Sequence, residues 1–354
     1  MLPHEPSRVL YLALCHDKVV SGRPTSSKRA QNVVLDQRIF WKNERIAFLA
    51  LTTLKGVGFW TLHQLATSKA GFKNTFKSNL YKYIKLEDGS ATPLTEIKKK
   101  LWQRGIKAVN ELAKDNTILI FHDEDRFPAK LKNIPDAPLW LFVQGDLKVL
   151  DTPSIAIVGT RKPSDEGMFL TKLILSALHR SKVSTVSGLA LGIDQLAHLE
   201  SVKYELPTVA VLGTGIKESY PKGSEAIRKL ILDNGGTIVT EYLPTQSYSS
   251  ENFVRRNRIQ AALSDILIPV EWKIKSGTAH TVGFAAKYNK QIINIYLPKT
   301  IGARPEIAFS RDSYGACEYE MPLEIPELLS KISLLPEKAP TQSIVSNAQL
   351  GLEL

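Results

Sequence analysis

From residue 154 onward, short apolar stretches rich in β-branched residues alternate with longer amphipathic stretches. The apolar stretches predict strands near residues 154–158, 183–186, 208–212, 237–240, 265–270 and 291–296. The stretches between them are long enough for helices and repeat apolar residues at helical spacing. Strands that alternate with helices in this way predict βαβ units and therefore a parallel sheet.

The chain before residue 154 has a different pattern, from which we expect four parts in all. Residues 1–40 predict an irregular lead-in, 41–115 a small helical domain, 116–333 a Rossmann-like domain and 334–354 a flexible tail. The helical part contains Lys55-Gly56-Val57-Gly58 between two helical stretches. Such a turn resembles a helix-hairpin-helix, whose amides can face a DNA phosphate, but a single turn fits an ordinary helical hairpin with a glycine cap better.

Short glycine-bearing turns follow several of the predicted strands. They are Gly159-Thr160-Arg161, Ser187-Gly188 through Gly192-Ile193-Asp194, Gly213-Thr214-Gly215 and, a few residues beyond its strand, Ser276-Gly277-Thr278. In a parallel sheet the carboxyl ends of the strands share one edge, where loops and helix N-termini bind ligands. The turns therefore predict one ligand-binding edge.

Basic residues accompany these turns. Arg161 offers a planar fork suited to phosphate, although it also fits an exposed arginine on a plain turn. The densest basic cluster is Arg255-Arg256-Asn257-Arg258, with Phe253, Tyr248 and Tyr242 close by as candidates for base stacking. The alternative is a solvated helix face with Phe253 in the core, and of the two we favour nucleic-acid binding. Lys275 adds positive charge beside Ser276.

Other chemistries find less support in the sequence. There is no G-x-S-x-G elbow, and Asp194 and His198 on one helix face do not make a catalytic triad. The Gly213 turn lacks the third glycine of a dinucleotide fingerprint. His122-Asp123-Glu124-Asp125 fits a solvated turn better than a metal site. We therefore expect no cofactor, no metal and no enzymatic activity.

The bulk composition favours an anionic partner and a reducing compartment. The 354 residues carry 46 Lys and Arg against 35 Asp and Glu, a net charge of +11, which favours nucleic acid. Two cysteines make no disulfide framework, which fits the cytoplasm. The apolar runs are strand-sized, so we expect no membrane-spanning helix.

These motifs, in this order, resemble the DNA-processing protein A (DprA/Smf) family. The likeness covers roughly residues 41–333 and extends to Tyr220-Pro221, Glu241 and Glu271. It implies an extended Rossmann-like parallel sheet with a small N-terminal helical domain of the SAM or helix-hairpin-helix type. It also implies binding of single-stranded DNA, loading of the recombinase RecA during natural transformation, and self-dimerisation.

By this resemblance, Arg161 and the arginines at 255, 256 and 258 hold phosphates, and Gly188, Gly192 and residues 276–278 shape the pocket floor. Three alternatives stay open. One is a phosphoribohydrolase-like enzyme with Glu241 or Glu271 as its acid. The others are an adaptor that docks an acidic protein and a paralogue from a defence locus or mobile element.

Overall fold

Nine strands form one sheet within the part of the chain that the computed structural model describes, residues 26–68, 70–83 and 93–336. The strands are β1 (Thr117–Phe121), β2 (Trp140–Gly145), β3 (Ser154–Val158), β4 (Ser184–Ser187), β5 (Thr208–Val211), β6 (Thr237–Thr240), β7 (Ile266–Pro269), β8 (Gln291–Tyr296) and β9 (Cys317–Glu320). Their order across the sheet is β1-β2-β6-β5-β4-β3-β7-β8-β9. The pairs from β6 to β9 are parallel, whereas β1 and β2 are antiparallel additions beyond β6.

The described helices lie before the sheet and between its strands. They are α1 (Ser26–Thr52), α2 (Phe59–Thr67), α3 (Phe72–Ser78), α4 (Leu94–Lys114), α5 (Ala129–Lys132), α6 (Asp165–Ala177), α7 (Ile193–Lys203), α8 (Glu225–Asp233), α9 (Ser250–Leu263), α10 (Gly277–Lys287), α11 (Pro305–Tyr314) and α12 (Ile325–Ser333). Three short 3₁₀ helices complete the set: η1 (Leu80–Lys82), η2 (Leu147–Asp151) and η3 (Ile301–Ala303).

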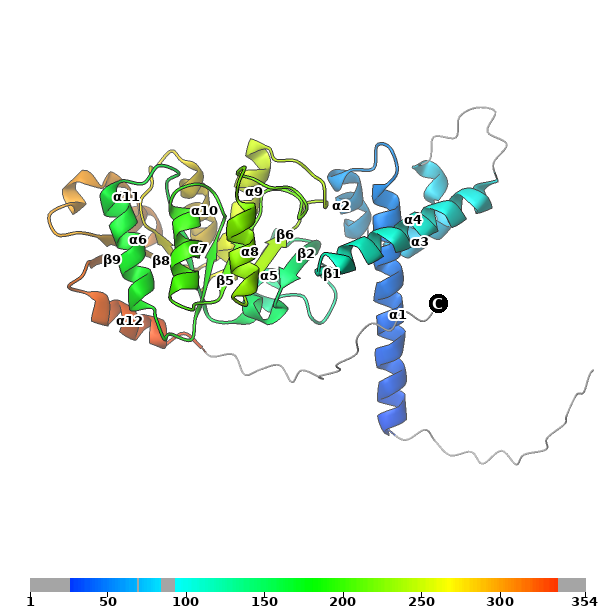
Figure 1. Ribbon diagram of the computed structural model, residues 1–354, viewed down its shortest axis with the longest axis horizontal. Helices are drawn as coiled ribbons and strands as arrows, with labels where there is room; N and C mark the ends of the chain where they lie inside the picture. Colours follow the sequence, from blue (N-terminus) through cyan, green and yellow to red (C-terminus); the bar gives the residue numbers. More distant parts are fainter. Residues whose placement is uncertain (1–25, 69, 84–92, 337–354) are drawn as a thin grey trace, which may run out of the picture. The chain divides into compact units, whose positions relative to one another are not determined.

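The sheet is buried on both faces, as its β-branched strands predict. Along β3, Ile155 and Ile157 pack into one apolar layer with α6, α7 and α12. Ala156 and Val158, which alternate with them, pack into the opposite layer with α9 and α10. Figure 1 shows α6, α7 and α8 side by side in front of the sheet, with α10 behind it. The predicted parallel α/β architecture is confirmed.

Aromatic side chains pack the helical segment against the antiparallel end of the sheet. Phe48 of α1 is fully buried, and its ring centroid lies 4.9 Å from that of Phe72, 5.7 Å from Phe121 and 5.0 Å from Trp140. Among the described residues, those from Glu44 onward belong to one compact unit, and residues 26–43 belong to the other. The predicted helical domain at 41–115 therefore shares its packing with the first two strands.

Two expectations need correction, and one cannot be assessed. The lead-in predicted over residues 1–40 is wrong for residues 26–40, because α1 begins at Ser26, where good helix formers follow two serines. Strand β9 was not predicted, since two of its four residues are glutamates. The tail lies outside the described residues from 337 onward. Pro269 ends β7, one residue before the predicted end of that strand.

Candidate nucleic-acid interface

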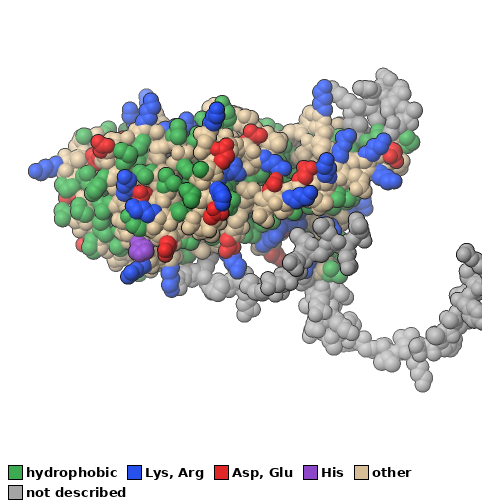
Figure 2. All heavy atoms as spheres, viewed as in Figure 1, with side chains coloured by type: hydrophobic (Ala, Val, Ile, Leu, Met, Phe, Trp, Pro, Cys, Tyr) green, Lys and Arg blue, Asp and Glu red, His purple; other side chains and the backbone are tan. Residues whose placement is uncertain are grey.

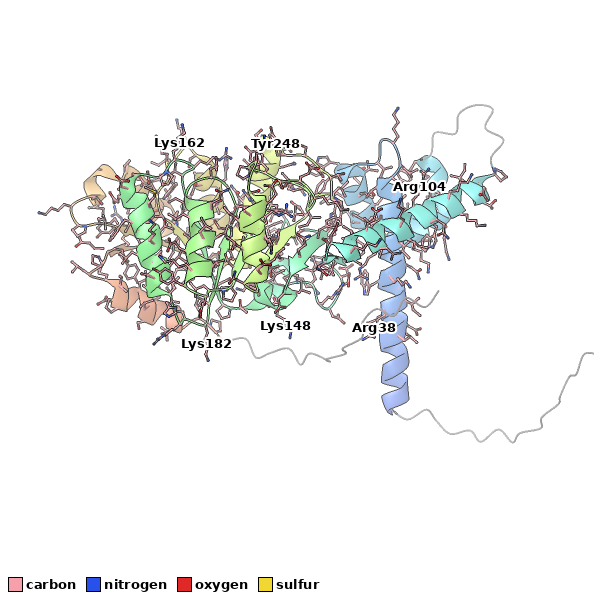
Figure 3. The ribbon with its side chains drawn as sticks, in the orientation of Figure 1. Arg38, Arg104, Lys148, Lys162, Lys182 and Tyr248 are labelled. Atoms are coloured by element: carbon pink, nitrogen blue, oxygen red, sulfur yellow. The ribbon has the colours of Figure 1, made fainter. Side chains whose placement is uncertain are left out.

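The turns after β3, β4, β5 and β7 meet at one edge, because these strands are neighbours and parallel. The chain leaves β3 toward β4 and later returns to the other side of β3 as β7. This reversal is where open α/β sheets bind ligands. Lys162, just after β3, and Tyr248, just before α9, point outward at this edge in Figure 3, whereas Lys148 and Lys182 lie at the opposite edge. Figure 2 shows Lys and Arg side chains along the same upper edge.

Backbone contacts hold the first turn in place. The Thr160 amide donates to the Glu271 carbonyl at 2.7 Å, and the Thr278 hydroxyl donates to the Gly159 carbonyl at 3.1 Å. A Cβ on Gly159 would lie 2.6 Å from Cγ1 of Ile193. Glycine is therefore required here for close packing, and Arg161 is left exposed at the tip of the turn.

The second turn fits against the first through its two glycines. Gly192 has a φ of +84°, and a Cβ there would lie 2.4 Å from the Thr160 carbonyl oxygen. A Cβ on Gly188 would lie 2.7 Å from both Arg256 Nη1 and Asp194 Oδ2. The Ser187 hydroxyl donates to the Ile157 carbonyl at 2.7 Å, so this predicted site residue is buried within the sheet edge. These residues shape the edge rather than face solvent.

Arg256 of α9 is a buried tie between the turns, only 4% exposed. Its Nη1 donates to the Gly188 carbonyl at 2.6 Å and to the Val211 carbonyl. Burial lowers the pKa of this guanidinium, while the nearby Asp194 carboxylate opposes that shift. Asp194 in turn accepts from the Gly188 amide at 3.2 Å, and burial raises the pKa of its carboxyl group. Arg256 thus fixes the ends of β4 and β5.

Arg258 and Arg255 share the buried carboxylate of Glu241. Arg258, 3% exposed, donates from Nη2 to Glu241 Oε2 at 2.6 Å. Arg255 donates from Nε to Oε1 at 3.2 Å and stays about one fifth exposed. A phosphate on Arg258 would have to break a buried ion pair, whereas Arg255 keeps an accessible surface.

The remaining predicted residues join α9 to the start of α10. The Asn257 side-chain amide donates to the Gly277 carbonyl at 3.0 Å. Ser276 caps α10 by accepting from the Ala279 amide at 3.3 Å. Lys275 and Gly277 are exposed, whereas Thr278 is buried. The structure therefore brings all these residues to one edge and exposes only some of them.

An aromatic cluster lies next to Arg161. The Phe253 ring is 4.9 Å from that of Tyr220 and 6.2 Å from that of Tyr248, and the Arg161 guanidinium carbon sits 5.6 Å from the Phe253 centroid. Tyr248 is 56% exposed. Sequence reasoning missed Tyr220 as a stacking residue, although its place beside Pro221 in the family motif marked it. Tyr242 was a wrong candidate, because it is 1% exposed.

The acids and the histidine considered for catalysis are held by other groups. The Glu271 side chain accepts from the Ser164 amide at 2.9 Å and from its hydroxyl at 3.0 Å at the start of α6. Glu241 pairs with two arginines. His198 is fully buried with Nδ1 2.8 Å from the Thr208 hydroxyl, and burial lowers its pKa to about 3. This arrangement suits anchoring of loops better than acid–base chemistry.

No helix in the part of the chain that the structure describes is both long and apolar enough to cross a membrane. Over residues 26–68, 70–83 and 93–336, no three His, Cys, Asp or Glu side chains gather where a metal ion could be held.

Known proteins share this sequence pattern and fold. Protein Smf of Synechocystis is 32% identical over 261 residues, 72% of this chain and 65% of that protein. DNA processing protein DprA of Streptococcus pneumoniae is 35% identical over 172 residues, 49% of this chain and 60% of that protein. The chain thus spans less than two thirds of the length of these curated relatives.

A solved structure of DNA processing protein A from Helicobacter pylori, described for its single-stranded DNA binding mode, matches with a TM-score of 0.53 and 27% identity. The match covers 61% of this chain and 96% of that one. The family model for DNA recombination-mediator protein A matches residues 118–307, more than half of the chain and most of the sheet. The chain therefore belongs to the DNA recombination-mediator protein A family.

Proposed function

We propose that this protein binds single-stranded DNA at the carboxyl edge of its sheet and acts as a recombination mediator in DNA uptake. The observation that carries the proposal is the exposed Arg161 beside the aromatic cluster of Tyr220, Tyr248 and Phe253. Arginine suits phosphates and aromatic rings suit bases, and together they bind single strands with little sequence preference. The net charge of +11 adds long-range attraction.

The proposed partners follow from family membership. They are single-stranded DNA, the recombinase RecA and a second copy of the chain, and the proposed setting is natural transformation in the cytoplasm. Support for the DNA comes from the Helicobacter pylori relative, whose structure was described for its single-stranded DNA binding. We further propose that the protein works without catalysis. The engagement of Glu241 and Glu271 in structural contacts favours this over a phosphoribohydrolase.

The test is a titration of fluorescent single- and double-stranded oligonucleotides at two salt concentrations. We expect tighter binding of the single strand, and weaker binding as salt rises. Arg161→Ala should weaken binding roughly tenfold and reduce the slope of log affinity against log salt by about 1, because one phosphate contact is lost.

Lys148→Ala is the matched control, since it removes one exposed positive charge at the opposite edge. If Lys148→Ala and Arg161→Ala weaken binding equally, net charge explains the affinity and the proposed site is wrong. Release of free base from nucleoside monophosphates by the wild type would instead establish an enzyme.

A further inference from the structure

A cavity of about 400 Å³ opens beside the proposed DNA-binding edge. Its walls come from three segments far apart in the sequence: the start of α2, the loop after β6 and the first turns of α9. Its size lies within the range of about 300–1,000 Å³ that is usual for small-ligand sites. In Figure 1 the loop that follows β6 extends toward α2, at the same edge as the N-terminus of α9.

Trp60 forms an aromatic wall of this cavity. Its side chain is 55% exposed, although tryptophan in a folded protein is largely buried as a rule. The neighbouring Phe59 is 8% exposed and packs on Tyr242 at a centroid distance of 5.5 Å. The chain segment that carries Trp60 is therefore anchored, while the indole itself stays accessible.

Arg255 holds the indole in position. Its guanidinium carbon lies 4.4 Å from the Trp60 centroid and 5.0 Å from that of Phe59. The same side chain donates to Glu241 at 3.2 Å, which further restricts its position. A stacked guanidinium and indole form a flat, ordered surface, which lowers the conformational cost of stacking another ring on it.

The charges along the wall favour a neutral ring over a phosphate. Arg255 is the single Lys or Arg among the described residues that line the cavity, and it is already paired with Glu241. Glu251 adds an exposed carboxylate, while Thr245 and Gln246 add uncharged hydrogen-bonding groups. Carboxylates repel phosphate but accept from the N–H groups of bases, including the ring N–H of thymine.

The first turns of α9 connect the cavity to the aromatic cluster. Asn252 and Arg255 line the cavity, and Phe253, which lies between them in sequence, belongs to the cluster with Tyr220 and Tyr248. Residues 252 to 255 span only about 5 Å along the helix axis. Phe253 points about 100° around the helix from Asn252, so a DNA strand that stacks on Phe253 reaches the cavity by crossing to the adjacent face of α9.

We infer that this cavity receives a nucleobase of the bound single-stranded DNA and that the base stacks against Trp60. This inference rests on the proposed function, which supplies the ligand. The surface that contacts the DNA then extends from the carboxyl edge of the parallel sheet to the start of α2. The Gly56–Gly58 turn takes part by presenting this indole, rather than as a phosphate-binding hairpin.

The test compares an oligothymidylate with an oligomer of the same length whose sugars all lack bases. Trp60→Leu should weaken binding of the oligothymidylate roughly tenfold, since one base–indole stack is lost. It should leave binding of the abasic oligomer unchanged, because the phosphates are untouched. Trp60→Phe should retain most of the affinity. Trp102→Leu, which removes an indole packed on Phe76 away from the cavity, is the matched control.

Several outcomes would overturn the inference. In one outcome, Trp60→Leu binds oligothymidylate with unchanged affinity while Arg161→Ala still weakens binding. The cavity then does not contact the DNA, and the proposed function is unaffected. If Trp60→Leu lowers the affinity for both oligomers equally, or if Trp60→Phe binds as weakly as Trp60→Leu, Trp60 has a structural role instead. If the wild type binds neither oligomer, the proposed function itself fails, and the inference fails with it.

Discussion

Two arginines at the same edge of the sheet have opposite environments. Arg161, at the tip of the turn after β3, is exposed and lies over the face of Phe253. Arg256, on α9, is 4% exposed and donates to the carbonyls of Gly188 and Val211. The first is available to a ligand, whereas the second fixes the backbone on which a ligand would lie.

The comparison shows that positive charge near a binding edge does not by itself identify a contact residue. A buried guanidinium with carbonyl and carboxylate partners is costly to expose and contributes shape. An exposed guanidinium on a turn costs little and contributes affinity. Substitution of the buried arginine should therefore lower the stability of the fold, whereas substitution of the exposed arginine should lower the affinity for the ligand.

The largest effect is expected for Arg256→Met. It leaves the Asp194 carboxylate buried without its positive neighbour, which should lower the free energy of unfolding by about 3–5 kcal/mol. Arg161→Ala should change it by less than about 1 kcal/mol, because that side chain is exposed. Urea unfolding followed by circular dichroism measures both. Comparable losses in the two variants would contradict the division.

Acid should destabilise the buried region through His198. Burial and the charge of Arg256 lower the pKa of this imidazole from 6.5 to about 3, so the unfolded chain binds the proton more readily than the folded one. Its contribution to stability is complete above pH 6.5 and falls by about 1.4 kcal/mol per pH unit below that, down to about pH 3. His198→Gln removes the titrating group.

The measurement is the unfolding free energy of wild type and His198→Gln at pH 7, 6, 5 and 4. The wild type should lose about 3 kcal/mol more than the variant between pH 7 and pH 4. Parallel pH profiles would mean that His198 ionises in the folded protein without penalty, contrary to its complete burial.

The smallest effects come from two glycines predicted for the same pocket. Gly188→Ala places a Cβ 2.7 Å from Arg256 Nη1 and Asp194 Oδ2, and should cost about 1–3 kcal/mol of stability. Gly277→Ala meets no atom within 4 Å and should stay within about 1 kcal/mol of wild type. Thermal unfolding ranks the pair. A Gly277→Ala variant that is the less stable of the two would contradict the distinction between a closely packed Gly188 and an open Gly277.

The sheet was predictable because its central strands are continuous apolar runs. Residues 154–158 and 291–296 were placed at the observed bounds of β3 and β8, since burial on both faces demands such runs. Strand β9 lacks that signal, because Glu318 and Glu320 interrupt it. The start of α1 was missed because its first residues, from Ser26, are polar and basic, as in a linker.

The position of the candidate site was predictable from the sequence, but which of its residues are exposed and which are buried was not. The turns at Gly159, Gly188 and Gly277 do meet at one edge, since the topology requires it. The burial of Arg256 depends on carbonyls that lie 45 and 68 positions away in the sequence. No local pattern carries that information, and the accessible indole of Trp60 was hidden for the same reason.

The hydrogen bonds of Arg256 also affect how much conformational entropy the protein loses when a ligand binds. The turns at Gly188 and Gly192 are already fixed without a ligand. The Arg256 guanidinium donates to the Gly188 carbonyl, Asp194 accepts from the Gly188 amide, and the Ile193 amide donates to the Thr160 carbonyl at 3.2 Å. In the proposed binding of single-stranded DNA, the protein would therefore lose little conformational entropy, and most of the entropy loss would fall on the flexible DNA strand. A surface of this kind can accept many sequences, since its shape does not depend on which bases it receives.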